Sequence, residues 1–227
     1  MTETPETPGA PEAPTGPPGG AQPPAAPPPA APPTAVGPAA DYPVHLDVER
    51  QEEYSRFMPL IKWLLAIPHY LVLLVLGIGA LFVVIFSFFA VLFTGRYPKG
   101  MFDYMVGVHR WALRVVAYTD LMVDPYPPFT LADDPDYPVQ FDIDYPEFVN
   151  RWRPLVHWLL VIPYAIVAYI IYYLGRILVF FAFFTILFTK RYPEGMFNIV
   201  QISLRWLARA SAYENWMVTR YPPFEWD

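Results

Sequence analysis

The sequence predicts an all-α integral membrane protein with two tandem repeats, each a transmembrane helical hairpin followed by an amphipathic interfacial helix. Short surface β-strands and a disordered Pro/Ala-rich N-terminal arm complete the prediction. Of the 227 residues, 55% are hydrophobic and 18% aromatic, which is typical of membrane proteins and not of soluble domains. The stretch LFTGRYPKGMF at 92–102 returns as LFTKRYPEGMF at 187–197. This close match indicates that one unit has been duplicated.

The first 40 residues predict a disordered arm. They contain fourteen prolines, and three glutamates are the only charged side chains. Such a segment has too little apolar bulk to offset the entropy lost on ordering, so we expect a partly polyproline chain. It lacks the basic start, apolar run and cleavage site of a secretory signal, so we expect the arm to be retained. The alternative is that the PPP run at 27–29 docks on a partner.

Two modules follow the arm with a constant offset of 95 positions. The first covers 42–129 and the second 137–224, joined by an acidic linker at 130–136. YPVHLDV at 42–48 and YPVQFDI at 137–143 alternate apolar and polar residues, which predicts a short surface strand at the start of each module. Each module ends in YPPF. We expect this tail to pair with the strand at an edge, where proline is tolerated.

The longest apolar run of each module predicts membrane segments. The runs at 59–93 and 154–188 have 35 residues each, about 52 Å as a straight helix, whereas a bilayer core is about 30 Å thick. We therefore expect each run to fold back on itself, with reversals at 77–80 and 172–176. A continuous helix would bury Arg176 near mid-bilayer, whereas a hairpin tip would place it in water.

The repeated loop after each run predicts the orientation. Two nearly identical polar loops suit the same environment, so each module should cross the membrane an even number of times. Basic residues flank both runs, which puts both ends of each hairpin and the N-terminal arm in the cytoplasm. We expect a multi-pass plasma-membrane protein with its tyrosine rings at headgroup level. The predicted interfacial loops comprise Arg96, Tyr97, Pro98, Arg191, Tyr192 and Pro193.

A helix with a narrow charged stripe follows each loop, at 101–123 and 196–218. We expect both helices to lie in the cytoplasmic interface, with their arginines at anionic headgroups. The alternative is a third spanning helix with its stripe buried against protein and Asp103 paired to Arg110, which would invert the second module. The predicted headgroup contacts are Arg110, Arg114, Arg205 and Arg209.

This succession of motifs resembles one family. The YP strand, PLIKWLLAIPH at 59–69, the long apolar run, FTGRYPKGMF at 93–102, RWALR and YPPF are similar to the bacterial membrane-protein family catalogued as domain of unknown function number 4389. The similarity covers residues 42–224 as two tandem copies. It implies a membrane location and a modular fold, and it transfers no catalytic residue. The second copy departs from the pattern at His157, Tyr164 and Lys190.

No motif in the chain predicts catalysis. There is no cysteine, and none of the four histidines recurs at the equivalent position of the other module, which argues against a symmetric metal or haem site. His69 and Arg176 are candidate intramembrane polar residues. The alternative for His69 is a side chain bonded to carbonyls that the preceding proline leaves free. Nucleophile-elbow, zinc-helix and phosphate-loop motifs are missing, so we expect no enzymatic activity and no cofactor.

Two hypotheses about function follow. The first is a non-enzymatic membrane scaffold or assembly protein that organises one leaflet. The second is a small transporter or lipid-handling protein with a site between the modules, lined by His69, Arg176 and the arginine stripes. The net charge of -6 and the lack of a large basic patch argue against nucleic acid. The expected partners are the lipid bilayer, anionic lipids, and a second copy or another membrane protein.

Overall fold

A computed structural model describes residues 42–226, so the predictions for the N-terminal arm lie outside the described residues. This part of the chain is mostly helical, with one small sheet. Each element of the second module begins 95 positions after its counterpart in the first. In chain order the elements are β1 (Val44–Val48), α1 (Met58–Leu65), α2 (Ile67–Thr94), α3 (Lys99–Thr119), β2 (Val139–Ile143), α4 (Arg153–Leu160), α5 (Ile162–Thr189) and α6 (Glu194–Glu214).

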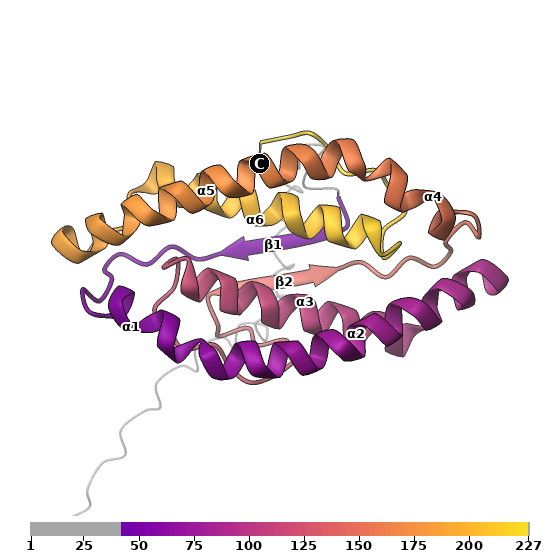
Figure 1. Cartoon of the computed structure of the whole chain (residues 1–227), viewed down its shortest axis with the longest axis horizontal. Coiled ribbons are helices and arrows are strands. Elements are labelled where there is room, and N and C mark those ends of the chain that lie inside the picture. Colours follow the sequence, from indigo (N-terminus) through magenta and orange to yellow (C-terminus); the bar gives the residue numbers. More distant parts are fainter. Residues whose placement is uncertain (1–41, 227) are drawn as a thin grey trace, which may run out of the picture. The chain divides into compact units, whose positions relative to one another are not determined.

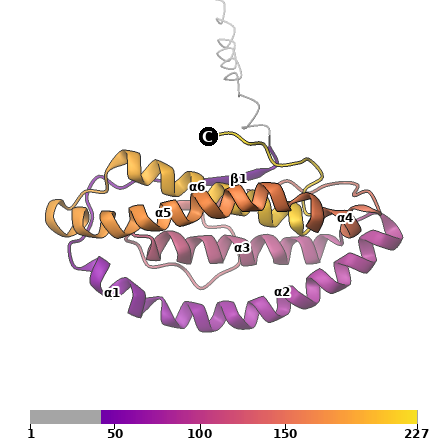
Figure 2. The ribbon, with the colours of Figure 1, turned by 45° about the horizontal axis from the view of Figure 1, so that its top comes forward.

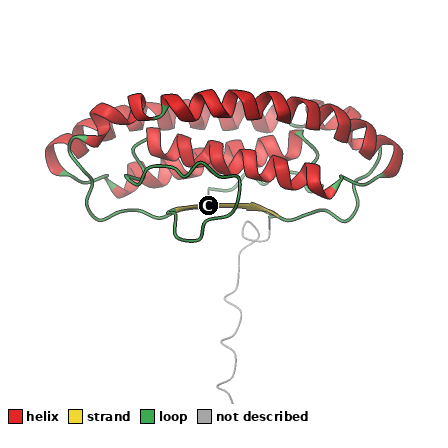
Figure 3. Cartoon of the chain, turned by 90° about the horizontal axis from the view of Figure 1, so that it is seen from below, coloured by secondary structure: helices red, strands yellow, loops and turns green. Residues whose placement is uncertain are grey.

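The described elements run alongside one another in three layers (Figures 1 and 3). Strands β1 and β2 form one outer layer, α3 and α6 the middle layer, and α2 and α5 the other outer layer. Helix α2 packs on α3 and α5 packs on α6, while α3 packs on β2 and α6 packs on β1. Helices α1 and α4 precede the two long helices, which are bowed (Figure 2). The sheet and the long helices therefore lie on opposite sides of the middle layer.

The apolar runs do not fold back, so the predicted transmembrane hairpins are wrong. Each of α2 and α5 is one helix of 28 residues. The short helices α1 and α4 precede them, and the boundaries fall at Ala66 and Val161. Pro68 and Pro163 stand in the first turn of the long helices, where proline is accepted because its missing N–H has no helical partner there.

The glycines at the predicted reversal stay inside the helix. A glycine costs about 1 kcal/mol relative to alanine in a helix, which is too little to break a long apolar run that packs along a neighbour. Gly79 also has a packing role, because a Cβ there would collide with the hydroxyl of Tyr104. That hydroxyl donates a hydrogen bond to Leu76 O at 2.8 Å. The sequence argument failed because it assumed that an apolar run longer than the bilayer core is thick must reverse direction within itself.

The chain reverses instead at the repeated loop, between α2 and α3 and between α5 and α6 (Figure 1). Gly95 and Lys190 adopt the left-handed conformation, with φ of 71° and 60°, which ends each long helix. Pro98 and Pro193 then stand immediately before the next helix. The eleven-residue stretch occurs twice because each copy makes the same helix-to-helix turn.

The two loop tyrosines, predicted at headgroup level, lie in the protein core. Tyr97 and Tyr192 are 0% and 1% exposed. Their rings meet Phe102 and Phe197 edge-on, with centroids 5.6 Å and 5.5 Å apart. A tyrosine beside proline suits both a membrane interface and a turn that packs inward, and the sequence alone does not distinguish them.

Strands β1 and β2 pair with each other, so the predicted pairing with the YPPF tails is wrong. The pairing is antiparallel, and Leu46 lies opposite Phe141, its own equivalent 95 positions further on. Two prolines in four residues leave a YPPF tail without the donors that a ladder needs. The alternating strands can donate at every position from Val44 to Val48 and from Val139 to Ile143.

The modules exchange their N-terminal segments. Strand β1 of the first module packs on α6 of the second, and β2 packs on α3 of the first. The exchange continues beyond the strands, because Tyr54 N donates to Lys190 O and Val149 N donates to Gly95 O, both at 2.9 Å. Tyr54 and Val149 are equivalent positions, as are Lys190 and Gly95. Each module therefore supplies part of the other's core.

The YPPF tails pack against the first turns of the long helices. In the first module, Phe129 stacks on His69 with ring centroids 4.1 Å apart. Tyr126 donates its hydroxyl to Leu65 O at 3.1 Å, beside the break between α1 and α2. The equivalent aromatic cluster in the second module comprises Tyr164, Trp206, Tyr221 and Phe224.

Candidate membrane-binding face and its polar support

The outward surface of α2 and α5 is apolar along its length except at Arg176, and we call it the apolar face. Side chains at every third or fourth position of α5, from Tyr164 to Ile186, are buried, and most of the others point outward. Soluble monomers rarely expose a continuous apolar surface of this extent. The most exposed side chains, at 61% to 72%, are Leu71, Leu74, Val75, Phe93, Tyr173, Phe180 and Phe188.

Two helical segments are long and apolar enough to span a membrane: Met58–Thr94 and Ile162–Thr189. Only 6% and 28% of their most apolar stretches are buried inside the protein. A core helix of a soluble protein would bury most of its surface, so these helices differ from such helices. Their exposed residues need an apolar environment that residues 42–226 do not provide.

The opposite outer layer is polar. In β1 and β2 the apolar residues are buried and the polar residues point outward, which confirms the alternation predicted for 42–48 and 137–143. The exposed side chains include His45, Asp47 and Asp142. Among the described residues, no group of three histidine, aspartate or glutamate side chains is placed to hold a metal ion.

Arg110 of α3 fixes strand β2 and the linker to the middle layer. Its Nε donates to Phe141 O at 2.9 Å, and a terminal nitrogen donates to Leu131 O at 3.1 Å. The other terminal nitrogen lies 3.3 Å from the carboxylate of Asp142. Only 10% of the Arg110 side chain is exposed, so the partners of its charge are groups of the protein itself.

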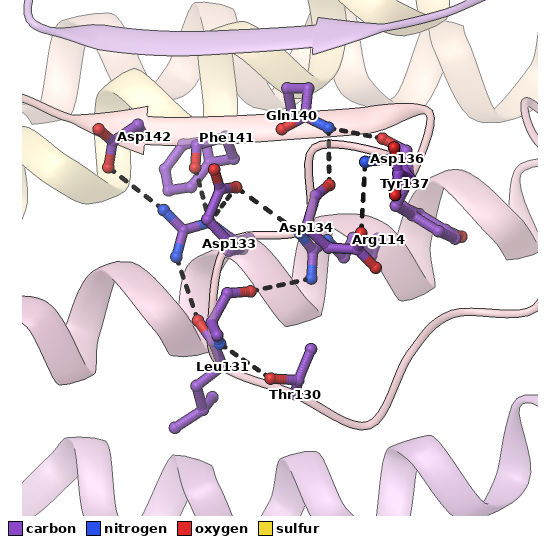
Figure 4. Close-up of polar contacts among 12 residues, drawn as sticks. Arg114, Thr130, Leu131, Asp133, Asp134, Asp136, Tyr137, Gln140, Phe141 and Asp142 are labelled. Atoms are coloured by element: carbon purple, nitrogen blue, oxygen red, sulfur yellow. Dashed lines mark hydrogen bonds and ion pairs between the residues drawn. The ribbon is translucent and has the colours of Figure 1, made fainter.

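Arg114, one helical turn further on, is fully buried under the linker (Figure 4). It donates to Ala132 O at 3.2 Å and lies 3.9 Å from Asp133. Its guanidinium also lies over the ring of Tyr137, 5.5 Å from the ring centroid. Burial lowers the pKa of Arg114, the charge of Arg110 lowers it further, and the acidic linker opposes both effects.

The second module repeats these contacts on β1. Arg205 donates from Nε to Leu46 O at 2.7 Å and lies 3.3 Å from Asp47. Arg209 is 3% exposed and lies over the ring of Tyr42, 5.5 Å from its centroid. Arg205 and Arg209 thus make with the first module the same contacts that Arg110 and Arg114 make with the second. The arginine stripes therefore hold each strand against the helix of the other module.

The predicted headgroup arginines thus have partners within the chain, and a lipid phosphate would have to compete with them. The spanning alternative placed the stripe against protein, and the structure does bury Arg110, Arg114 and Arg209 there. That alternative also paired Asp103 with Arg110, which is wrong: Asp103 contacts Lys99, while Arg110 contacts Asp133 and Asp142.

The candidate polar residues of the long helices have separate partners. His69 is fully buried, and its Nδ1 accepts a hydrogen bond from Trp111 Nε1 at 3.0 Å. The prediction that it bonds to freed carbonyls is therefore not what the structure shows. Arg176 lies in the middle of α5, not at a hairpin tip, and forms an ion pair with Asp120 at the end of α3. His69, Arg176 and the stripes do not share partners, unlike the lining predicted for a transport site.

The sequence analysis did not predict a role for three further buried or partly buried polar side chains, which are Lys62, His157 and His109. Lys62 donates to Val123 O at 2.7 Å and lies 2.8 Å from Asp124. Its equivalent, His157, bonds through Nδ1 to Tyr213 O at 2.7 Å. Lysine and histidine can replace each other because both donate to a backbone carbonyl from the same helical position. The sequence signal for such a donor was the presence of lysine and histidine at equivalent positions of the two modules.

His109 joins the two middle-layer helices. Its Nε2 lies 2.8 Å from Ser211 Oγ, and its Nδ1 lies 2.7 Å from Met105 O. A carbonyl only accepts, so Nδ1 carries the proton and Nε2 accepts from the serine. Burial lowers the pKa of His109, and the bond to Met105 partly opposes this. Burial likewise lowers the pKa of His157.

This geometry defines a class: a two-module helical protein with one apolar face and one polar face. The chain belongs to the family described as Domain of unknown function (DUF4389), whose model matches residues 59–130 and 151–225. The two matched segments confirm the two tandem copies expected from the sequence. They leave out both exchanged strands. No curated protein and no solved structure matches the chain.

Proposed function

We propose that this protein is a non-enzymatic membrane scaffold that lies in one leaflet, with α2 and α5 parallel to the membrane plane. The observation that carries this proposal is the stacking order. The apolar face and the polar sheet occupy the two outer layers, with α3 and α6 between them (Figure 3). A protein with this polarity suits a boundary between hydrocarbon and water.

A crossing orientation conflicts with the same stacking. The strands run alongside the long helices (Figure 1), so helices that crossed the bilayer would carry the sheet to the same depth. The exposed carboxylates of Asp47 and Asp142 would then face hydrocarbon, at a cost of about 2.5 kcal/mol or more for each charge. An orientation in the membrane plane leaves both carboxylates in water. We therefore favour it over the multi-pass arrangement expected from hairpins.

The dimensions of the long helices support a scaffolding role. Each helix has 28 residues, about 42 Å in length and about 10 Å in diameter. Two such helices inserted side-on add area to one leaflet and none to the other. This asymmetry gives the protein a physical means of organising or bending a membrane without catalysis.

Cysteine accessibility tests the orientation, because the natural chain has no cysteine. Glu52→Cys precedes the first apolar segment and Gly100→Cys follows it; both positions are exposed. A Cβ at Gly100 meets no atom within 4 Å. An in-plane arrangement predicts that an impermeant maleimide labels both sites from the same side of sealed vesicles. Labelling from opposite sides would show that the helix crosses.

The second module offers a matched control. Glu147→Cys and Gly195→Cys are the equivalent positions, and both are exposed. They should label from the same side as the first pair. Asp47→Cys on the sheet should label from that side as well, because the sheet faces water in the proposed orientation.

A further inference from the structure

Most basic residues of the described chain fall into two groups. Those of the first group lie within 4.0 Å of a carboxylate, as Lys62 does of Asp124, Arg110 of Asp142, and Arg176 of Asp120. The second group has no carboxylate within 4.0 Å among residues 42–226. It comprises Arg56, Arg96, Arg151, Arg153, Lys190 and Arg191.

Arg153 is not free, because it contacts Thr219 O. The other five residues lie where a long helix ends and the exchanged segment of the other module arrives. The Tyr54–Lys190 backbone bond brings Arg56 of the first module to the loop of the second. The Val149–Gly95 bond brings Arg151 to the loop of the first. We call Arg56, Lys190 and Arg191 the first end cluster, and Arg96 and Arg151 the second.

Each end cluster stands beside exposed aromatic rings. Phe57 and Trp152, at equivalent positions just before α1 and α4, are 74% and 70% exposed. Phe188 and Phe93, near the ends of α5 and α2, are 72% and 70% exposed. Aromatic rings next to basic side chains are typical of the level where hydrocarbon meets headgroups. The charges therefore lie at the two ends of the apolar face.

The first end cluster also lines a surface hollow. A surface pocket of about 390 Å³ is lined by Ser55, Arg56, Phe57 and Lys190, together with Glu53 and Tyr54. In the second cluster, Arg151 packs over the loop, since a Cβ added at Gly95 would lie 3.5 Å from its side chain. Arg96 lies over the exposed ring of Phe148, 5.1 Å from its centroid.

We propose that the two end clusters are equivalent binding sites for the phosphate of anionic lipid headgroups, each built by both modules. The inference rests on the proposed function, since it needs the apolar face to lie in a leaflet. Residues from both modules are required at each site, so binding also depends on the segment exchange. The middle-layer arginines, which are already paired, are not part of either site.

Lipid selectivity in reconstituted vesicles tests this proposal. Electron paramagnetic resonance measures how strongly the full-length protein associates with spin-labelled phosphatidylglycerol and with spin-labelled phosphatidylcholine. We call the first association constant divided by the second the ratio, and its amount above 1 the excess. One basic residue near an anionic membrane surface strengthens binding by about fivefold, so we expect a preference of that order. Arg56→Gln with Arg191→Gln should remove about half of the excess. Adding Arg96→Gln and Arg151→Gln should lower the ratio further, to the preference that Lys190 alone retains.

Lys99→Gln is the matched control. Lys99 is basic and 62% exposed, but it is paired with Asp103, so its loss should leave the ratio unchanged. The proposal is overturned by a wild-type ratio of 1, by an unchanged ratio in the fourfold variant, or by an equal loss in Lys99→Gln. A ratio of 1 together with same-side cysteine labelling would reject the end clusters alone. Selective binding with opposite-side labelling would instead reject the in-plane orientation.

Discussion

Replacing Arg176 with leucine should destabilise the protein more than replacing its partner Asp120 with asparagine. The carboxylate of Asp120 is 1% exposed, while the Arg176 side chain is 41% exposed. Losing the arginine leaves a buried charge without its partner, which costs about 3–5 kcal/mol when both groups are buried. Solvent at the half-exposed arginine reduces this to about 2–3 kcal/mol. Losing the acid leaves a half-exposed arginine whose long side chain can extend to the headgroup level, at a cost of about 1 kcal/mol.

The other module provides the matched control for this pair. The positions equivalent to Arg176 and Asp120 hold Leu81 and Asn215, so Arg176→Leu with Asp120→Asn recreates a neutral pair that the fold already contains. We expect the double variant to lose about 1 kcal/mol or less, which is a coupling energy of about 2 kcal/mol. The assay is guanidinium unfolding in mild detergent, followed by tryptophan fluorescence. Equal losses for the two single variants, or an additive double variant, would refute the ion-pair reasoning.

Three other predictions concern the loop, the buried histidines and the sheet. Lys190→Gly should raise the unfolding free energy by about 1 kcal/mol, because a left-handed φ of 60° strains a side chain; an unchanged denaturation midpoint would contradict this. Burial lowers the pKa of His109 and His157, so the unfolded chain binds more protons in acid and stability should fall as pH drops below about 6.5. An unfolding free energy that stays constant between pH 7 and pH 5 would contradict this prediction. His45→Cys with Asp142→Cys should form a disulfide on mild oxidation, since these residues pair across the strands; a gel without a redox-dependent shift would count against the register.

Some of the fold could be predicted from the sequence because it depends on patterns within one module. The alternation in YPVHLDV and YPVQFDI predicted strands that the structure contains, and the family match confirms the two copies. The charged stripe on each middle-layer helix was also visible. Such patterns report which face of an element is buried. They do not report what buries it.

The rest depends on contacts between modules, which no local pattern encodes. The partners of Arg110 and Arg205 are backbone carbonyls of exchanged strands, and a carbonyl has no sequence signature. The end clusters join Arg56 to Lys190, which lie 134 positions apart in the chain. The hairpin prediction failed because an apolar run of 35 residues is compatible with two short crossings and with one helix lying along a membrane.

Spin-label depth along α2 tests the central claim most directly. Labels at Leu71→Cys, Ile78→Cys and Phe89→Cys, all at least 50% exposed, span about 27 Å of helix from first to last. Power saturation with oxygen and a nickel chelate reports the depth of each label in the bilayer. An in-plane helix predicts similar depths at all three positions, within about half a leaflet. Labels at headgroup level at Leu71 and Phe89 together with a label at the bilayer midplane at Ile78 would contradict it and show that α2 crosses the membrane.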